Sequence, residues 1–183
     1  MRALTSGLLA ASVLGLAGGV AAQTPTTELA RASLTGPDGN DLGIVEFTQT
    51  PNGVWVRAAL NGLPQGTHGF HIHETGECEP PFESAGGHYN PHGSEHGFLT
   101  EGGPHAGDLP NLNVPESGKV TFEAFSSALS ISGGEAELFD DDGSAVIVRA
   151  GADDYSSQPS GVAGDRIACG VLETYREAAE GTA

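Results

Sequence analysis

Turn-forming residues interrupt this chain so regularly that they leave little room for long helices. Its 183 residues include 28 glycines and 11 prolines, and turn signals recur roughly every eight to twelve residues, a spacing typical of short strands joined by turns. Along 54–60, apolar residues alternate with Trp55 and Arg57, as a half-buried strand requires. The preceding Asn52-Gly53 is typical of a hairpin turn. The pattern predicts an all-β domain, either a sandwich or a flattened barrel.

About eight strands are expected. We place them at 31–34, 43–50, 54–61, 67–74, 119–125, 135–139, 145–150 and 166–172. Two long irregular segments lie between them, at 75–116 and 151–165. Loops of such length are uncommon unless they are functional or held by additional bonds. The sequence therefore predicts a β-domain with two long functional loops.

The first 22 residues have the features of a secretory signal peptide: Arg2, an apolar run over 8–20 and a small-residue cleavage site ending at Ala22. The apolar run is too short to favour a membrane-spanning helix. We expect a signal peptide at 1–22, a single domain at 23–183 with no membrane span, and export to the periplasm or the extracellular space.

The only two cysteines, Cys78 and Cys169, are far apart in sequence. In an exported protein such a pair usually forms a disulfide. Closing a loop of this length would stabilise the fold by roughly 4–5 kcal/mol in the chain-entropy model.

The net charge is strongly negative. It is formally −17, and loss of Arg2 with the signal peptide makes it −18. Such a surface disfavours nucleic acids and anionic membranes as partners. An anionic substrate would need a local cationic guide.

All seven histidines lie between His68 and His105. His71 and His73 are two positions apart on an expected strand, so both imidazoles leave the same face. This pair alone is weak evidence, because surface histidines without a ligand role and cupin-type enzymes also show it. A cupin would take further ligands from a later strand, where this chain has no histidine.

A second group is more specific. It offers three imidazoles and one carboxylate from one glycine-rich segment: His88, His96, His105 and Asp108. Three histidines and one aspartate form a closed four-coordinate set suited to zinc. A closed set indicates a structural role for the metal.

Taken together, these segments resemble the copper–zinc superoxide dismutases, and in particular their bacterial exported members. The similarity extends over most of the mature chain. It is carried by His68-Gly-Phe-His-Ile-His73, by Gly86-Gly-His-Tyr-Asn-Pro91, by His105-Ala-Gly-Asp-Leu-Pro-Asn111 and by Gly164-Asp-Arg-Ile-Ala-Cys-Gly170.

The resemblance implies an eight-stranded Greek-key barrel and assigns roles to the residues within these motifs. His71, His73 and His88 match copper ligands, with His88 bridging to zinc, and the zinc set is His88, His96, His105 and Asp108. Arg166 matches the arginine that guides superoxide, and Cys169 matches the second disulfide cysteine. Asp153 matches an aspartate that links copper and zinc histidines.

One position departs from the family pattern. The fourth copper ligand is a histidine, and Arg149 stands in its place. An arginine does not deprotonate in a protein and cannot supply the missing donor. We expect that Asp153 pairs with Arg149 instead of a histidine. His92 is a spare histidine that we expect to lie in solvent.

The resemblance implies dismutation of superoxide to oxygen and hydrogen peroxide by copper redox cycling, in a monomer or homodimer that holds zinc and, at a weakened site, copper. The alternative is a non-catalytic zinc-binding protein on the same fold, which also buffers copper. Arg149 is the motive for that alternative, since a fold does not guarantee its chemistry.

Overall fold

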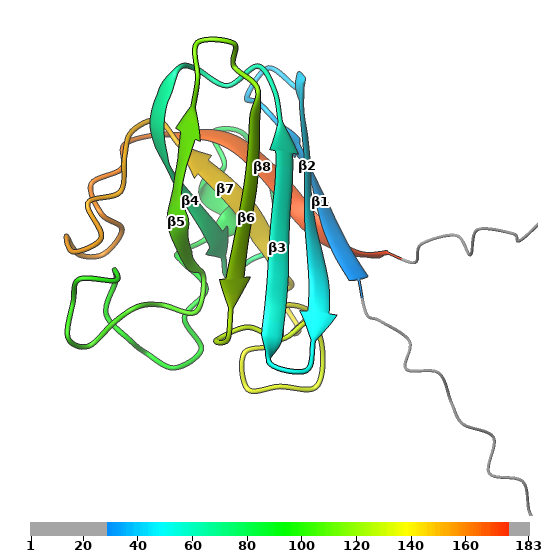
Figure 1. Cartoon of the computed structure of the whole chain (residues 1–183). Coiled ribbons are helices and arrows are strands. Elements are labelled where there is room, and N and C mark those ends of the chain that lie inside the picture. Colours follow the sequence, from blue (N-terminus) through cyan, green and yellow to red (C-terminus); the bar gives the residue numbers. More distant parts are fainter. Residues whose placement is uncertain (1–28, 176–183) are drawn as a thin grey trace, which may run out of the picture.

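The computed structural model describes residues 29–175, which form eight strands and one short 3-10 turn (Figure 1). The signal peptide expected at 1–22 lies outside the described residues. The strands are β1 (Leu29–Thr35), β2 (Asp41–Thr50), β3 (Gly53–Leu60), β4 (Gly66–His73), β5 (Asp108–Val114), β6 (Val120–Ser126), β7 (Ala145–Arg149) and β8 (Arg166–Tyr175). The 3-10 turn η1 covers Glu83–Ala85.

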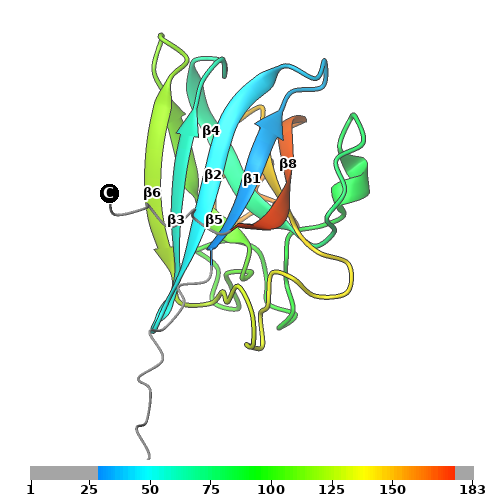
Figure 2. The same ribbon diagram turned by 90° about the vertical axis from the view of Figure 1, so that its right-hand side faces the viewer.

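The strands form one antiparallel sheet that curls into a barrel. Their order is β5-β4-β7-β8-β1-β2-β3-β6, and the two end strands, β5 and β6, lie next to each other. Figure 2 shows β1, β2, β3 and β6 side by side, with β4 behind them. Because β4 pairs with β5 and β7 rather than with β3, the chain crosses the barrel in a Greek-key order, and the expected fold is confirmed.

Period-two alternation builds the core as the sequence predicts. In β3 the side chains of Val54, Val56 and Leu60 are buried, whereas Trp55 and Arg57 face outward. Burying a valine or leucine side chain contributes about 1.5–3 kcal/mol. The inward-facing side chains of the neighbouring strands are buried in the same way, and together they form one apolar core inside the barrel.

One of the eight predicted strands is wrong and one observed strand was not predicted, although the number of strands is right. The strand β5 lies inside the segment expected to be irregular, and 135–139 contains no strand, only an isolated bridge between Ser130 and Glu137. Pro110 argues against a strand, because proline cannot donate to a ladder. It is tolerated here because β5 pairs only with β4 and Pro110 is exposed. The alternation at 135–139 arises because Ala136 and Leu138 are buried without strand pairing.

Two long loops, 74–107 and 150–165, connect the strands; the second loop and the later part of the first lie at the left in Figure 1, whereas η1, also in the first loop, lies behind the barrel. Backbone hydrogen bonds join them, as between the Leu99 N–H and the Tyr155 carbonyl at 3.0 Å. Within 29–175, no helix has the length and apolar character needed to span a membrane. The loops and the adjacent strands β4, β5 and β7 surround the histidines.

Candidate metal centre

The strand β4 fixes the first two histidines at the base of the site. His71 and His73 are fully buried, because β5 and β7 flank β4 and the long loops cover its outer face. An isolated bridge pairs His73 with His88, which anchors the glycine-rich segment to the end of β4. The bridge therefore brings the expected pair on β4, His71 and His73, into contact with the second expected group, which contains His88.

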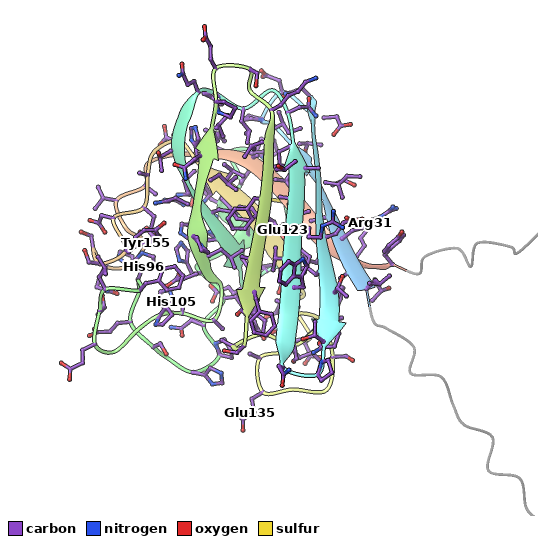
Figure 3. The ribbon with its side chains drawn as sticks, viewed as in Figure 1. Arg31, His96, His105, Glu123, Glu135 and Tyr155 are labelled. Carbon is purple, nitrogen blue, oxygen red and sulfur yellow. A yellow bond between two sulfur atoms is a disulfide. The ribbon has the colours of Figure 1, made fainter. Side chains whose placement is uncertain are left out.

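Three imidazoles converge on one carboxylate oxygen. The Nδ1 atoms of three histidines lie at 2.8, 3.1 and 3.4 Å from Asp108 Oδ1, in the order His88, His96, His105. All four residues are buried, and their ligand atoms lie within 4.8 Å of one another. We call these four residues the candidate zinc group. Figure 3 shows His96 and His105 together on the side of the long loops.

A second set shares His88. The ligand atoms of His71, His73 and His88 also lie within 4.8 Å of one another, and we call these three residues the candidate copper group. His71 Nδ1, His73 Nε2 and His88 Nε2 are buried without any hydrogen-bond partner. A buried polar atom without a partner is costly unless something else satisfies it. Three such nitrogens on adjacent rings fit a metal ion that prefers imidazole ligands.

The opposite nitrogens of these rings are tethered. Asp153 Oδ2 accepts from His71 Nε2 at 2.8 Å, and Oδ1 lies 3.0 Å from His96 Nε2. His73 Nδ1 bonds to the Gly86 carbonyl at 3.0 Å. Such outer bonds fix the tautomer and orientation of metal-binding rings. The carboxylate of Asp153 therefore spans both groups. The expectation that it pairs with Arg149 was wrong, because two histidines and the Tyr155 N–H occupy its oxygens.

Burial favours the neutral forms of His73 and His88. Burial lowers the pKa of His88 to about 4, and it lowers the pKa of His73 well below its ordinary value. Burial opposes ionisation of Asp108, but hydrogen bonds from His88 and the Gly97 N–H outweigh it and hold the pKa of that carboxyl below its ordinary value. Neutral imidazoles and an ionised carboxylate are the forms that bind metals.

Arg149 stands at the rim of the candidate copper group without joining it. Its Cγ and the Cε1 of His71 approach the same point above Gly69, at 3.1 and 2.9 Å from a Cβ placed on that glycine. Its side chain lines a surface pocket together with Arg166. The side chain thus lies between the ring of His71 and this pocket, with its Nε buried.

Arg166 is held by backbone carbonyls. Its Nη1 donates to the Phe82 carbonyl at 2.6 Å and its Nη2 to the Gly86 carbonyl at 2.7 Å. The Gly86 carbonyl also accepts from His73. The arginine and a candidate copper ligand thus share one acceptor, which sets their relative position.

The cysteines form the expected disulfide, Cys78–Cys169. It joins the first long loop to β8, three residues beyond Arg166. The bond fixes the segment whose carbonyls receive the arginine.

Two other histidines lie outside both groups. His92 is exposed, as expected. The ring nitrogens of buried His68 bond to the backbone carbonyls of Arg149 and Pro64 at 2.8 and 3.0 Å, which ties the start of β4 to the end of β7.

Three polar residues position the site although the sequence analysis assigned none of them a role. The side-chain amide of Gln158 accepts from the His96 N–H at 2.8 Å and donates to its carbonyl at 2.9 Å. Asn111 makes the equivalent pair of bonds with the backbone of Asp153. The hydroxyl of Tyr155 accepts from the Asn111 N–H at 2.8 Å. Each acts through backbone atoms of a segment distant in sequence, so only the folded chain makes these roles visible.

Comparisons with known proteins identify relatives over most of this chain. Residues 42–172 match the family model described as copper/zinc superoxide dismutase (SODC). A relative from Aquifex aeolicus, superoxide dismutase [Cu-Zn] 2, is 42% identical over 170 residues, covering 91% of this chain and 97% of the relative. The extracellular superoxide dismutase [Cu-Zn] of Caenorhabditis elegans is 36% identical over 142 residues, covering 74% of this chain and 62% of the relative. The crystal structure of a SOD-like protein from Bacillus subtilis superposes with a TM-score of 0.75 at 41% identity, covering 78% of this chain and 97% of that one.

Proposed function

Because the chain belongs to the copper/zinc superoxide dismutase family, we propose that it dismutes superoxide to oxygen and hydrogen peroxide. The observation that carries the proposal is the convergence of three unpartnered buried nitrogens, on His71, His73 and His88, beside a fixed arginine. Copper held by these residues would supply a one-electron redox couple, so that one superoxide could be oxidised to oxygen while a second, reduced by that electron, takes up two protons to form hydrogen peroxide.

The zinc role falls to His88, His96, His105 and Asp108. Their four ligand atoms surround one position with the composition of a closed zinc site. His88 belongs to both groups, with Nδ1 toward Asp108 and Nε2 unpartnered. We assign this ring the bridging role, because its two nitrogens face two different groups.

Arg166 supplies the guide for an anionic substrate. The chain carries a formal charge of −17, so a superoxide anion approaching at random meets repulsion over most of the surface. The guanidinium lies beside the candidate copper group, held by the carbonyls of Phe82 and Gly86. We expect it to attract the substrate locally and to orient it toward the three histidines.

The proposed place of action is outside the cytoplasm. A signal peptide at 1–22 would direct the chain to the periplasm or to the extracellular space. The disulfide fits an oxidising compartment. The partner is superoxide as a small-molecule substrate, and the oligomeric state, monomer or homodimer, stays a prediction.

Arg149 favours a second candidate function. With three histidines in the candidate copper group and an arginine at its rim, the chain has the features of a zinc-binding protein that holds copper without cycling it. In that case the fold keeps zinc and buffers copper.

One experiment separates the two functions. The mature protein is loaded with copper and zinc, freed of excess metal, and assayed for superoxide dismutation per bound copper. The dismutase proposal predicts copper-dependent activity that His73→Ala abolishes, since His73 belongs only to the candidate copper group. His92→Ala is the matched control, because that histidine is exposed, and it should keep full activity. Bound zinc with dismutation no higher than in the His73→Ala variant would instead establish the non-catalytic function.

A further inference from the structure

Two arginines face each other across neighbouring strands at the mouth of the centre. Arg149 on β7 is paired with Arg166 on β8, immediately after a β-bulge that follows Val148. Burial and then the positive charge of Arg166 lower the pKa of Arg149, so the two like charges oppose each other. Both side chains line one open pocket of about 490 Å³. The barrel therefore concentrates positive charge at one place on an acidic molecule.

The two guanidinium groups are satisfied very unequally. Arg166 donates to two backbone carbonyls and lies 3.4 Å from a carboxylate oxygen of Glu83. Arg149 makes no side-chain hydrogen bond and no ion pair with any residue of 29–175, and its Nε is buried without an acceptor. A buried donor without an acceptor is unfavourable, and a charged one more so.

The nearby carboxylates do not resolve this imbalance. Glu83 and Asp165 also line the pocket. Glu83 is engaged with Arg166 and is 76% exposed, so water screens its charge strongly. Within the described part of the chain, neither carboxylate comes within ion-pair distance of Arg149.

We propose that Arg149 and Arg166 together bind a small oxyanion in this pocket, of the class that includes phosphate, bicarbonate and a carboxylate group. A planar guanidinium presents paired donors that match the oxygens of such anions. An anion between the two arginines supplies the acceptor that Arg149 lacks and offsets the repulsion between like charges. The site is built from protein side chains alone, so it stands whether or not copper cycles beside it.

The pocket also lies close to the candidate copper group. The Cγ of Arg149 and the ring of His71 meet over Gly69, so an anion held by Arg149 sits next to the face where a substrate anion would approach. Binding of this oxyanion therefore competes with any other anion that Arg166 attracts.

Inorganic phosphate titrated into the zinc-loaded, copper-free protein tests the proposal, with sodium chloride keeping the ionic strength constant. The readouts are calorimetric binding and the ¹⁵N shifts of the arginine side chains. Saturable binding is expected, with the Arg149 Nε resonance moving, and Arg149→Gln should weaken it at least about tenfold, which is about 1.4 kcal/mol. Bicarbonate and acetate titrations form parallel arms, and the anion with the tightest Arg149-dependent binding identifies the ligand.

Controls keep the result interpretable. Arg57→Gln removes an exposed arginine on β3 that pairs with Glu123, and it should leave phosphate binding unchanged. Arg149→Lys keeps the charge but loses the planar fork, so binding should fall between the natural chain and Arg149→Gln. The proposal is overturned if none of the three anions binds saturably up to about 50 mM, well above the millimolar range of weak sites. It is equally overturned if Arg149→Gln and Arg149→Lys both bind like the natural chain.

Discussion

The candidate zinc group and the candidate copper group share His88, yet they differ in the number of ligands that the chain supplies: four for the first and three for the second. Around the first, three imidazole nitrogens surround one oxygen of Asp108, and the other oxygen of that carboxylate accepts two backbone N–H groups, from Gly97 and His105. Around the second, three nitrogens have no partner, and the residue at the rim is an arginine, which supplies no ligand. The first group is thus a closed structural unit, and the second stays open on the side where Arg149 and Arg166 stand.

The largest effect should follow from breaking the closed group. Asp108→Ala removes its central carboxylate and leaves two buried backbone N–H groups without an acceptor. Zinc affinity should fall at least about 1,000-fold, or about 4 kcal/mol, measured by competition with a chelator. The exposed Asp38 provides the control, and Asp38→Ala should bind zinc normally. Unchanged zinc affinity in Asp108→Ala would contradict the assignment of this group.

Completing the open group should have the next largest effect. In Arg149→His, the new ring begins near the Cγ position that lies beside His71 over Gly69. A fourth imidazole should raise copper affinity on the order of 100-fold, or about 2.7 kcal/mol, in a competition titration, while zinc affinity stays constant. Arg149→Gln separates the loss of charge from the gain of a ligand, since it supplies no imidazole. Equal copper affinity in the two variants would show that position 149 does not reach the metal.

Acid should weaken both groups together because they share His88, a buried histidine whose neutral form burial favours. The unfolded chain takes up a proton at His88 near its ordinary pKa of 6.5, whereas in the folded protein the pKa is about 4. Stability of the metal-free protein should therefore fall as the pH drops from 6.5 toward 4. Asp153 acts in the same direction at lower pH: burial opposes its ionisation, but the hydrogen bonds from His71 and His96 hold its pKa at about 2.

Calorimetric Tm values of the metal-free protein between pH 7.5 and 4 check this expectation. The unfolding temperature should decline steadily below pH 6.5, and zinc should be released over a similar interval, because protons compete for the ring nitrogens. A Tm that stays constant across this interval would mean that the histidines are not held neutral by burial.

The smallest effect should come from loosening the closed group indirectly. Gln158→Ala removes the two bonds that hold the backbone of His96. Zinc affinity should fall about tenfold, the lower end of the effect of residues that support metal ligands, while copper binding changes less. Gln65 is exposed on the loop before β4, so Gln65→Ala is the matched control. A loss as large as that of Asp108→Ala would show that Gln158 is required for the loop to fold.

The sequence predicted which histidines and which aspartate come together better than it predicted the strands around them. Histidine and aspartate at these spacings carry strong chemical information, and both groups assemble from the residues expected. Strand placement failed at β5 because Pro110 is a local signal against strand, whereas its tolerance depends on β5 pairing along one edge only. The partner of Asp153 was also missed, because which ring reaches that carboxylate depends on how the 150–165 loop folds over His71 and His96.

The shared ring of His88 has a consequence for how this chain can change over generations. A substitution at His88 damages both groups at once, whereas residue 149 touches only one of them. Selection should therefore tolerate fewer substitutions at His88, which belongs to both groups, than at position 149, which adjoins only the candidate copper group. A single substitution at residue 149 can therefore impair the candidate copper group while the candidate zinc group stays intact. The reverse substitution can restore it.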